Sequence, residues 1–261
     1  MISAVLQGAR ILVCRPEPAA SELVQVLESV GAVTYTFPTI AIKPIALTAE
    51  NQQKIYDLDQ YKKVLVVSQY AAKLGLQQVE MRWPQFPVQQ KWFGIGRKST
   101  DILLDAGLDV HPASHEWTSE TLLNLTPLRN VQGERILVLK GEGGRSVLEQ
   151  GLRDRGALID TLSLYTRALP AYSKDSVSEV CDVFNANCMI ALSAETLDNF
   201  KSLVSTNASV LSNVLLIVSS ERVAEHANSI GFCNPVVSKG LKPIDIVRCI
   251  AKNKKIGKAK Q

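Results

Sequence analysis

The 261-residue chain has the composition of an ordinary globular protein, with 46% hydrophobic and 21% charged residues. Its net charge of +4 is carried by the five lysines of the C-terminal stretch 252–260. Without them the rest of the chain, its body, has a net charge of −1 (+4 − 5). A nearly neutral body with 6% aromatic residues argues against a dedicated nucleic-acid-binding protein, and no apolar run approaches the roughly 20 residues that a membrane span needs.

The N-terminus and the cysteines indicate a cytoplasmic protein. The opening stretch MISAVLQGARILV lacks a basic flank followed by a long apolar core, so we expect no signal peptide. The five cysteines are scattered and form no Cys-x-x-Cys pair. This pattern is typical of thiols in a reducing compartment.

The first predicted strand begins at Ile11, and a helix with apolar residues at 23, 27 and 30 follows it. The pattern returns later in the chain. The stretch ILVCRPEPAASELVQVLESVGA from Ile11 aligns without a gap with ILVLKGEGGRSVLEQGLRDRGA from Ile136, at an offset of 125 (136 − 11). Each copy ends in a Gly-Ala pair, where a helix C-terminal glycine belongs. The chain therefore contains an internal repeat.

The repeat continues in the next predicted units. VLVVSQYAA from Val64 aligns with MIALSAETL at the same offset, which places Ser68 opposite Ser193. WFGIGRKSTDILLDAGL then corresponds to LLIVSSERVAEHANSIGF at an offset of 124 (231 − 107), so that Gly107 meets Gly231. Strands that alternate with helices in this way predict parallel sheets covered by helices on both faces.

Two proline-bracketed stretches occupy equivalent places in the two copies, FPTIAIKPI from Phe37 and LSLYTRALPAY from Leu162. Their alternating, β-rich pattern predicts strands rather than linkers. We interpret them as the crossings between two domains.

Polar residues and glycines gather at the carboxyl ends of the predicted strands, where parallel sheets bind their ligands. Glycine lets the backbone approach a ligand closely, and the unpaired N–H groups at a helix start attract anions. The alternative for each single loop is a tight turn without function. The residues at these ends are Arg15, Ser68, Gly94, Gly96, Lys140, Gly141, Gly143, Gly144, Ser193 and Ser219.

Other kinds of site are poorly supported. The turn KGEGGR has neither the Gly-x4-Gly-Lys-Ser/Thr of a phosphate loop nor a full G-x-G-x-x-G, because Arg145 stands at the last glycine position. His111 and His115 are separated by Pro112 and have no acidic or cysteine ligand nearby, so we expect no metal. Ser68 lacks the G-x-S-x-G elbow, and capping a helix suits it better.

Together these stretches resemble the uroporphyrinogen-III synthase family over nearly the whole chain. The most specific part is ILVLKGEGGRSVLEQGLRDRGALIDTLSLYTR, in which Lys/Arg-G-x-G-G-Arg opens a helix, Arg-Gly-Ala ends it and Tyr-x-Arg closes an extended segment. FPTIAI, VVSQYAA, FGIGRKSTDILLDAGL and TSETLL support the resemblance. Cys14, Val67, Leu192 and the Ser219–Ser220 pair depart from the residues common in the family.

The resemblance implies an α/β fold of two flavodoxin-like parallel-sheet domains joined by a two-stranded β-ladder, with the first domain discontinuous. On this chain, domain 1 would comprise 1–37 and 170–252, and domain 2 would comprise 45–163. The ladder strands would be 38–44 and 164–169, and 253–261 would be a basic tail.

The resemblance also implies a cofactor-independent lyase that needs no metal. Its substrate would be hydroxymethylbilane, a linear tetrapyrrole with an acetate and a propionate on each ring. The bilane would lose water and close to uroporphyrinogen III in a cleft between the domains, with inversion of the terminal ring through a spiro intermediate. Tyr165 is then the candidate proton donor. Arg145 and the strand-end residues would hold carboxylates, and capping of its own helix is the alternative role for Arg145.

We expect a cytoplasmic monomer that binds a small molecule and neither nucleic acid nor membrane. A transient contact with the upstream bilane-producing enzyme is compatible with this function. Two other interpretations remain open. The first is a non-catalytic two-domain cytosolic binding protein for a small acidic ligand, and the second is a nucleotide-sugar transferase with two Rossmann-like domains.

Overall fold

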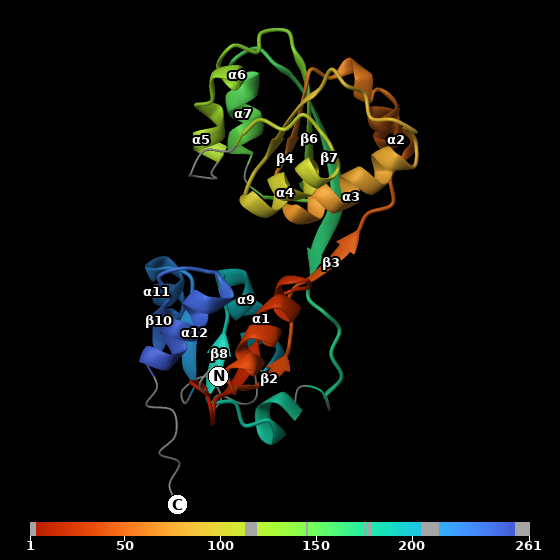
Figure 1. Ribbon diagram of the computed structural model, residues 1–261. Helices are drawn as coiled ribbons and strands as arrows, with labels where there is room; N and C mark the ends of the chain where they lie inside the picture. Colours follow the sequence, from red (N-terminus) through yellow and green to blue (C-terminus); the bar gives the residue numbers. More distant parts are fainter. Residues whose placement is uncertain are drawn as a thin grey trace, which may run out of the picture. The chain divides into compact units, whose positions relative to one another are not determined.

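The structure is a computed structural model that describes residues 4–112, 119–144, 146–174, 176, 179–204 and 214–253. The chain divides into two compact units, each built around a five-stranded sheet (Figure 1). Unit 1 comprises Met1–Ala41 and Ala168–Gln261, and unit 2 comprises Ile42–Arg167. Both chain crossings fall inside the two proline-bracketed stretches.

The sheet of unit 1 has the order β10-β9-β8-β1-β2. Every neighbouring pair in it is parallel. Read from β2 in chain order this is 2-1-3-4-5, the order of a flavodoxin-like sheet. The strands are β1 (Arg10–Val13), β2 (Val33–Thr36), β8 (Cys188–Ile190), β9 (Leu215–Val218) and β10 (Pro235–Val237).

Helices cover both faces of this sheet. Ile11 and Val13 of β1 pack with residues of α1 and α12 in one apolar cluster, whereas Leu12 packs with residues of α9 and α11 in another. This alternation of buried side chains is what a strand covered on both faces requires. The helical segments are α1 (Ala19–Ser29), a π-helical turn (Glu179–Val183), α9 (Ala194–Leu203), α11 (Glu221–Ser229) and α12 (Pro243–Lys252).

The sheet of unit 2 has the order β3-β7-β6-β4-β5. The pairs β4–β5, β4–β6 and β6–β7 are parallel, whereas the arrows of β3 and β7 point in opposite directions in Figure 1. The strands are β3 (Ala41–Pro44), β4 (Lys63–Val66), β5 (Lys91–Gly94), β6 (Arg135–Gly141) and β7 (Leu158–Ala168).

Two apolar clusters lie on the two faces of this sheet as well. One joins α2, α3 and α4 to Val64, Val66 and Leu137, and the other joins α5, α6 and α7 to Leu65 and Val138. The helices are α2 (Ala49–Tyr56), a short 3-10 turn (Leu58–Gln60), α3 (Gln69–Glu80), α4 (Arg97–Asp105), α5 (Ser119–Leu123), α6 (Thr126–Arg129) and α7 (Val147–Arg153). The prediction of parallel-sheet α/β domains is thereby confirmed.

The extended stretches differ in length from the expected ladder strands. β3 is a four-residue strand, but β7 is an eleven-residue strand that begins at Leu158. Its first part pairs with β6, as far as Tyr165 opposite Gly141, and Leu164 also accepts a hydrogen bond from the backbone of Ile45. The second ladder strand is therefore the continuation of a sheet strand and not a separate element.

The repeat does not assign one copy to each unit. Strands β1 and β2 of the first copy lie beside β8 and β9 of the second, while β4 and β5 of the first lie beside β6 and β7 of the second. If each strand is replaced by its counterpart in the other copy of the repeat, the order β9-β8-β1-β2 of one sheet becomes the order β5-β4-β6-β7 of the other. Each unit thus takes half of each copy.

Candidate functional site

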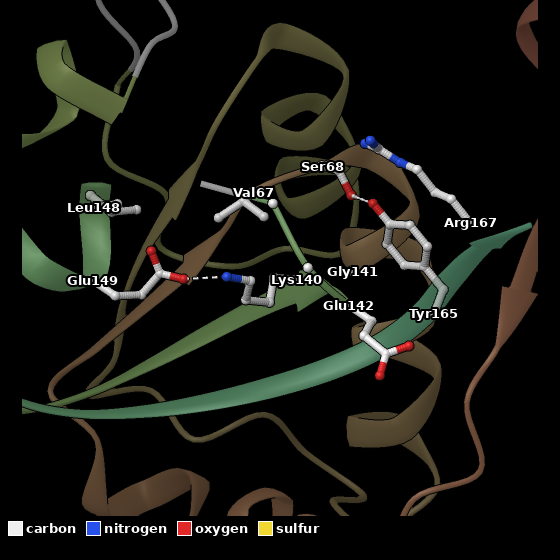
Figure 2. A pocket seen from close by; sticks show the side chains of 11 residues that line it. Val67, Ser68, Lys140, Gly141, Glu142, Leu148, Glu149, Tyr165 and Arg167 are labelled. Carbon is white, nitrogen blue, oxygen red and sulfur yellow. Dashed lines mark hydrogen bonds and ion pairs between the residues drawn. The ribbon is translucent and has the colours of Figure 1, made fainter. Parts of the chain in front are cut away.

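A pocket of about 130 Å³ opens in unit 2 where β4, β6 and β7 reach their carboxyl ends (Figure 2). Six of the predicted site residues line it, namely Ser68, Lys140, Gly141, Gly143, Gly144 and Tyr165. Five residues that had not been predicted complete the lining, namely Val67, Glu142, Leu148, Glu149 and Arg167.

A pair of hydroxyl groups stands at one end of the pocket. The Oγ of Ser68 and the phenolic oxygen of Tyr165 are 2.9 Å apart and share a hydrogen bond in which either group can donate. Ser68 is the N-cap of α3, and its Oγ also accepts a hydrogen bond of 3.0 Å from the backbone N–H of Ala71. The cap therefore fixes the serine that holds the tyrosine.

Tyr165 is held from its other sides too. It is 2% exposed, and its ring meets the ring of Tyr70 edge-on at a centroid distance of 5.7 Å. The β6–β7 register shifts after Lys140, so that Gly141 lies opposite Tyr165. A Cβ atom at position 141 would come within 2.6 Å of the tyrosine ring. Glycine is required there because any side chain would displace the phenol.

The glycine turn continues along the rim of the pocket. Gly143 and Gly144 have φ values of 73° and 86°, in the left-handed region that favours glycine. A Cβ atom at either position would meet nothing within 4 Å, so the backbone conformation and not the available space requires these glycines.

A buried ion pair forms the opposite wall. Lys140 at the end of β6 places its Nζ 2.5 Å from Oε1 of Glu149 on α7, and both side chains are mostly buried. Lys140 was expected to offer its charge to a ligand carboxylate. The structure shows that Glu149 already balances part of that charge.

The other predicted residues of unit 2 lie outside this lining. Gly94 ends β5, and its carbonyl accepts a hydrogen bond of 3.4 Å from the hydroxyl of Thr100. Gly96 is the N-cap of α4, with φ at 87°. Arg145 and His115 lie outside the residues that the structure describes, as does the tail beyond Asn253.

Arg15, Ser193 and Ser219 belong to unit 1, where they follow the adjacent strands β1, β8 and β9. Ser193 caps α9 through a hydrogen bond of 3.1 Å from the N–H of Thr196. This geometry matches that of Ser68 on α3, which confirms that the two repeated serines cap helices. Ser219 directly precedes Ser220, the N-cap of α11.

Of the residues that were missed, Arg167 had a signal in the sequence. It lies two positions after Tyr165 on a strand, and alternate residues of a strand share a face. Glu149 had no comparable signal, because its contact with Lys140 depends on where α7 begins.

The lining offers a hydroxyl pair, backbone N–H groups and ionisable side chains of both signs. His111 and His226 do not line it. Burial raises the pKa of the thiols of Cys14 and Cys188, which argues against thiolate chemistry at either position. Within the described ranges no group of three or more His, Cys, Asp or Glu side chains could hold a metal ion, and no helix there has the length and apolarity to cross a membrane.

Comparison with known proteins gives consistent matches. A family model described as "Uroporphyrinogen-III synthase HemD" matches residues 21–247. The uroporphyrinogen-III synthase of Escherichia coli K12 is 31% identical over 229 residues, which cover 85% of this chain and 92% of that protein. The same enzyme of Salmonella typhimurium is 29% identical over 225 residues, with the same coverage.

Solved structures agree in fold. The uroporphyrinogen-III synthetase of Helicobacter pylori has a TM-score of 0.62 at 13% identity, and a mutant uroporphyrinogen III synthase of Thermus thermophilus has a TM-score of 0.58 at 15% identity. Each match covers 94% of this chain and 99% of the solved chain. At such identities the similarity supports the two-domain α/β fold alone.

Proposed function

The chain belongs to the uroporphyrinogen-III synthase family, and from this membership we propose that it cyclises hydroxymethylbilane to uroporphyrinogen III with loss of water. The observation that carries the proposal is the match over most of the chain, together with 31% identity across 92% of the Escherichia coli enzyme. The finer steps below rest on the family resemblance and on the chemistry of the pocket in unit 2.

The first step is loss of the terminal hydroxyl group, which leaves as water only if its oxygen gains a proton. We assign this proton to Tyr165. The hydroxyl of Ser68 has one hydrogen, and its oxygen already accepts from the N–H of Ala71. When Ser68 donates to the phenolic oxygen 2.9 Å away, the proton of Tyr165 is left to point toward a ligand. A positioned acid of this kind is general acid catalysis.

The resulting cation is then attacked by the substituted carbon of the far ring, which gives the spiro intermediate, and fragmentation and reclosure invert that ring. The last step releases a proton as the pyrrole regains its aromaticity. In this proposal the phenolate of Tyr165 takes this proton back, so the protein ends the cycle in its starting state. In the interval, the hydroxyl of Ser68 would stabilise the phenolate.

The carboxylates of the substrate are held mainly by backbone donors in this proposal. The four ionisable side chains described in the lining apart from Tyr165 are Lys140, Arg167, Glu142 and Glu149, and their charges sum to zero. The glycine turn and the start of α3 supply N–H groups that favour anions without adding charge. From the family resemblance, further carboxylate contacts are assigned to Gly94, Gly96 and Arg145, and to Arg15, Ser193 and Ser219.

We further propose that the reaction needs no metal or cofactor and takes place in the cytoplasm, with the protein as a monomer. Because the uncatalysed closure gives the uninverted isomer, the chief contribution of the protein is to fold the bilane into one geometry.

The decisive experiment supplies hydroxymethylbilane generated in situ, oxidises the products to porphyrins and separates the I and III isomers. We expect isomer III to predominate over an enzyme-free control. Isomer I alone, formed at the rate of the control, would contradict the proposed function. Such a result combined with tight bilane binding would favour a binding protein for acidic ligands.

A further inference from the structure

Arg167 lies at the exposed end of β7, beside the hydroxyl pair. The pairing of β7 with β6 ends at Tyr165, and Arg167 stands two positions further along the strand. Side chains two apart on a strand project from the same face. Both residues line the pocket, and Figure 2 shows the guanidinium of Arg167 turned toward the end where Ser68 and Tyr165 meet.

Exposure to solvent distinguishes Arg167 from Lys140. A carboxylate that approaches Lys140 also meets the negative charge of Glu149, which is 2.5 Å from the ammonium group. The side chain of Lys140 is 15% exposed, whereas Arg167 as a residue is exposed. Of the two cationic side chains that the structure describes in the lining, Arg167 is the more exposed to an anion from solvent.

The guanidinium group suits the ligand of the proposed function. It remains charged at all physiological pH values and binds a carboxylate through two parallel N–H donors, which fixes orientation as well as position. The terminal ring that loses its hydroxyl group carries an acetate and a propionate. A contact to one of them would orient that ring relative to Tyr165.

From this geometry we propose that Arg167 binds a carboxylate of the reacting terminal ring and thereby places its hydroxymethyl group against the hydroxyl pair. The inference rests on the proposed function and adds a substrate-binding residue to its site. In this arrangement Lys140 forms part of the pocket wall through its ion pair with Glu149, and Arg167 binds the incoming carboxylate.

The test compares Arg167→Ala with Arg153→Ala in the full-length protein, using hydroxymethylbilane generated in situ. Arg153 is an exposed arginine on α7 outside the pocket lining, so its removal changes the net charge equally. We expect the KM of Arg167→Ala to rise roughly 10- to 100-fold, the range for loss of a charge-assisted hydrogen bond, with kcat within about twofold. Arg153→Ala should keep the wild-type KM.

The ratio of isomers I and III in the product gives a second measurement, which a merely structural role of Arg167 would leave unchanged. At bilane concentrations below the raised KM, more substrate should escape Arg167→Ala and close to isomer I. Arg167→Lys keeps the charge but loses the two-donor geometry, so its KM should lie between those of the wild type and Arg167→Ala.

Equal KM values for Arg167→Ala and Arg153→Ala would overturn the inference. So would a reduced kcat at unchanged KM, which would assign Arg167 to the chemical step. If Arg167→Ala melts below the assay temperature, Arg167→Lys decides the question, and a wild-type KM for it overturns the inference. If the wild-type protein yields only isomer I, the proposed function itself is contradicted. Failure of the proposed function can therefore be distinguished from failure of the inference about Arg167.

Discussion

The contact between Gly141 and Tyr165 shapes the pocket at the scale of single residues. The ring lies so close to the backbone of β6 that a Cβ atom at position 141 would be 2.6 Å from it. The ring is held from below by this strand, from the side by Tyr70, and at its hydroxyl by Ser68. A side chain fixed on all these sides is pre-organised for proton transfer.

Removal of the phenolic hydroxyl tests the assignment of Tyr165. Tyr165→Phe keeps the ring contacts, so we expect its unfolding midpoint to change by the equivalent of only about 1 kcal/mol, the usual value of one hydrogen bond. Its kcat should fall roughly 10²- to 10⁴-fold, which is the usual contribution of a general acid. Tyr56→Phe, at a 53% exposed tyrosine, is the matched control. Near-normal turnover of Tyr165→Phe would reject the proton-donor role.

The contribution of Ser68 to catalysis can be separated from its contribution to stability as a helix cap. Ser68→Ala and Thr48→Ala each remove an N-cap that accepts from the third residue of its helix, so each should lose about 1 kcal/mol of unfolding free energy in urea titrations. Only Ser68→Ala also removes a partner of Tyr165. Its kcat should fall roughly tenfold while Thr48→Ala keeps the wild-type value. Equal kcat values would show that Ser68 is a cap alone.

Several site residues could be predicted from sequence because local chemistry marks them. Ser68 follows an apolar strand and opens a helix, and Gly143 and Gly144 stand in a turn that needs left-handed backbone. Arg167 could have been predicted in a similar way, because it lies two positions after Tyr165 on a strand and alternate residues of a strand share a face. The pairing of Lys140 with Glu149 could not have been predicted, because it depends on packing between β6 and α7.

At the scale of elements, a polar cluster joins the beginnings of three strands of unit 2. Tyr61, just before β4, donates a hydrogen bond of 2.8 Å to Asp160 on β7. Arg135 on β6 forms an ion pair of 3.1 Å with the same carboxylate and lies over the ring of Tyr61 at 4.7 Å. This cluster lies at the end of the sheet opposite the pocket and fixes the strands whose other ends form the site.

This cluster predicts a dependence of stability on alkaline pH. Burial, and then the hydrogen bond to Asp160, raise the pKa of Tyr61 above its ordinary value of 10.0. The folded state therefore keeps a proton that the unfolded chain loses. The stabilisation by Tyr61 is complete below about pH 10 and declines above it, at no more than ~1.4 kcal/mol per pH unit.

The measurement is the difference in unfolding free energy between the wild type and Tyr61→Phe, which lacks the titrating group. Other tyrosines and lysines contribute equally to both proteins and cancel in the difference. We expect the advantage of the wild type to stay constant up to about pH 10 and to shrink as the pH rises above it. A constant difference would contradict the shifted pKa.

The elements themselves were largely predictable, and their register was not. Buried parallel strands are apolar runs that end at polar turns, so β1, β4, β6 and β8 could be located in the sequence. The register shift after Lys140 leaves the apolar pattern of both strands unchanged, so nothing in the sequence indicated that Gly141 would face Tyr165. The full length of β7 was also missed, because the strand pairs with β6 from Leu158 to Tyr165 and has β3 as its other neighbour.

At the scale of the whole molecule, each unit has its own sheet and its own pair of apolar clusters. Unit 2 is one continuous segment, Ile42–Arg167, whereas unit 1 joins the two ends of the chain. The two units therefore differ in how their folding depends on the rest of the chain, because unit 1 cannot form until the C-terminal segment is available.

A fragment of residues 42–167 should consequently fold by itself. Its core clusters are complete within the segment, so we expect helical and strand circular dichroism and one cooperative thermal transition. The matched fragment 1–41 keeps the β1–β2 pair but lacks β8, the other neighbour of β1, and the C-terminal helices, so it should be unfolded alone. A non-cooperative melt of 42–167 would show that its stability depends on unit 1.

The repeat across the sheets also bears on ancestry. Because each unit takes half of each copy, a chain with only one copy would hold one half of each sheet and could complete neither alone. Two such chains could complete both by exchanging halves, which is a domain-swapped homodimer. This strand order is the one that a gene duplication would leave if it fused such an intertwined dimer into one polypeptide and let the two halves diverge. That divergence is visible where Cys14-Arg15-Pro16 corresponds to Leu139-Lys140-Gly141.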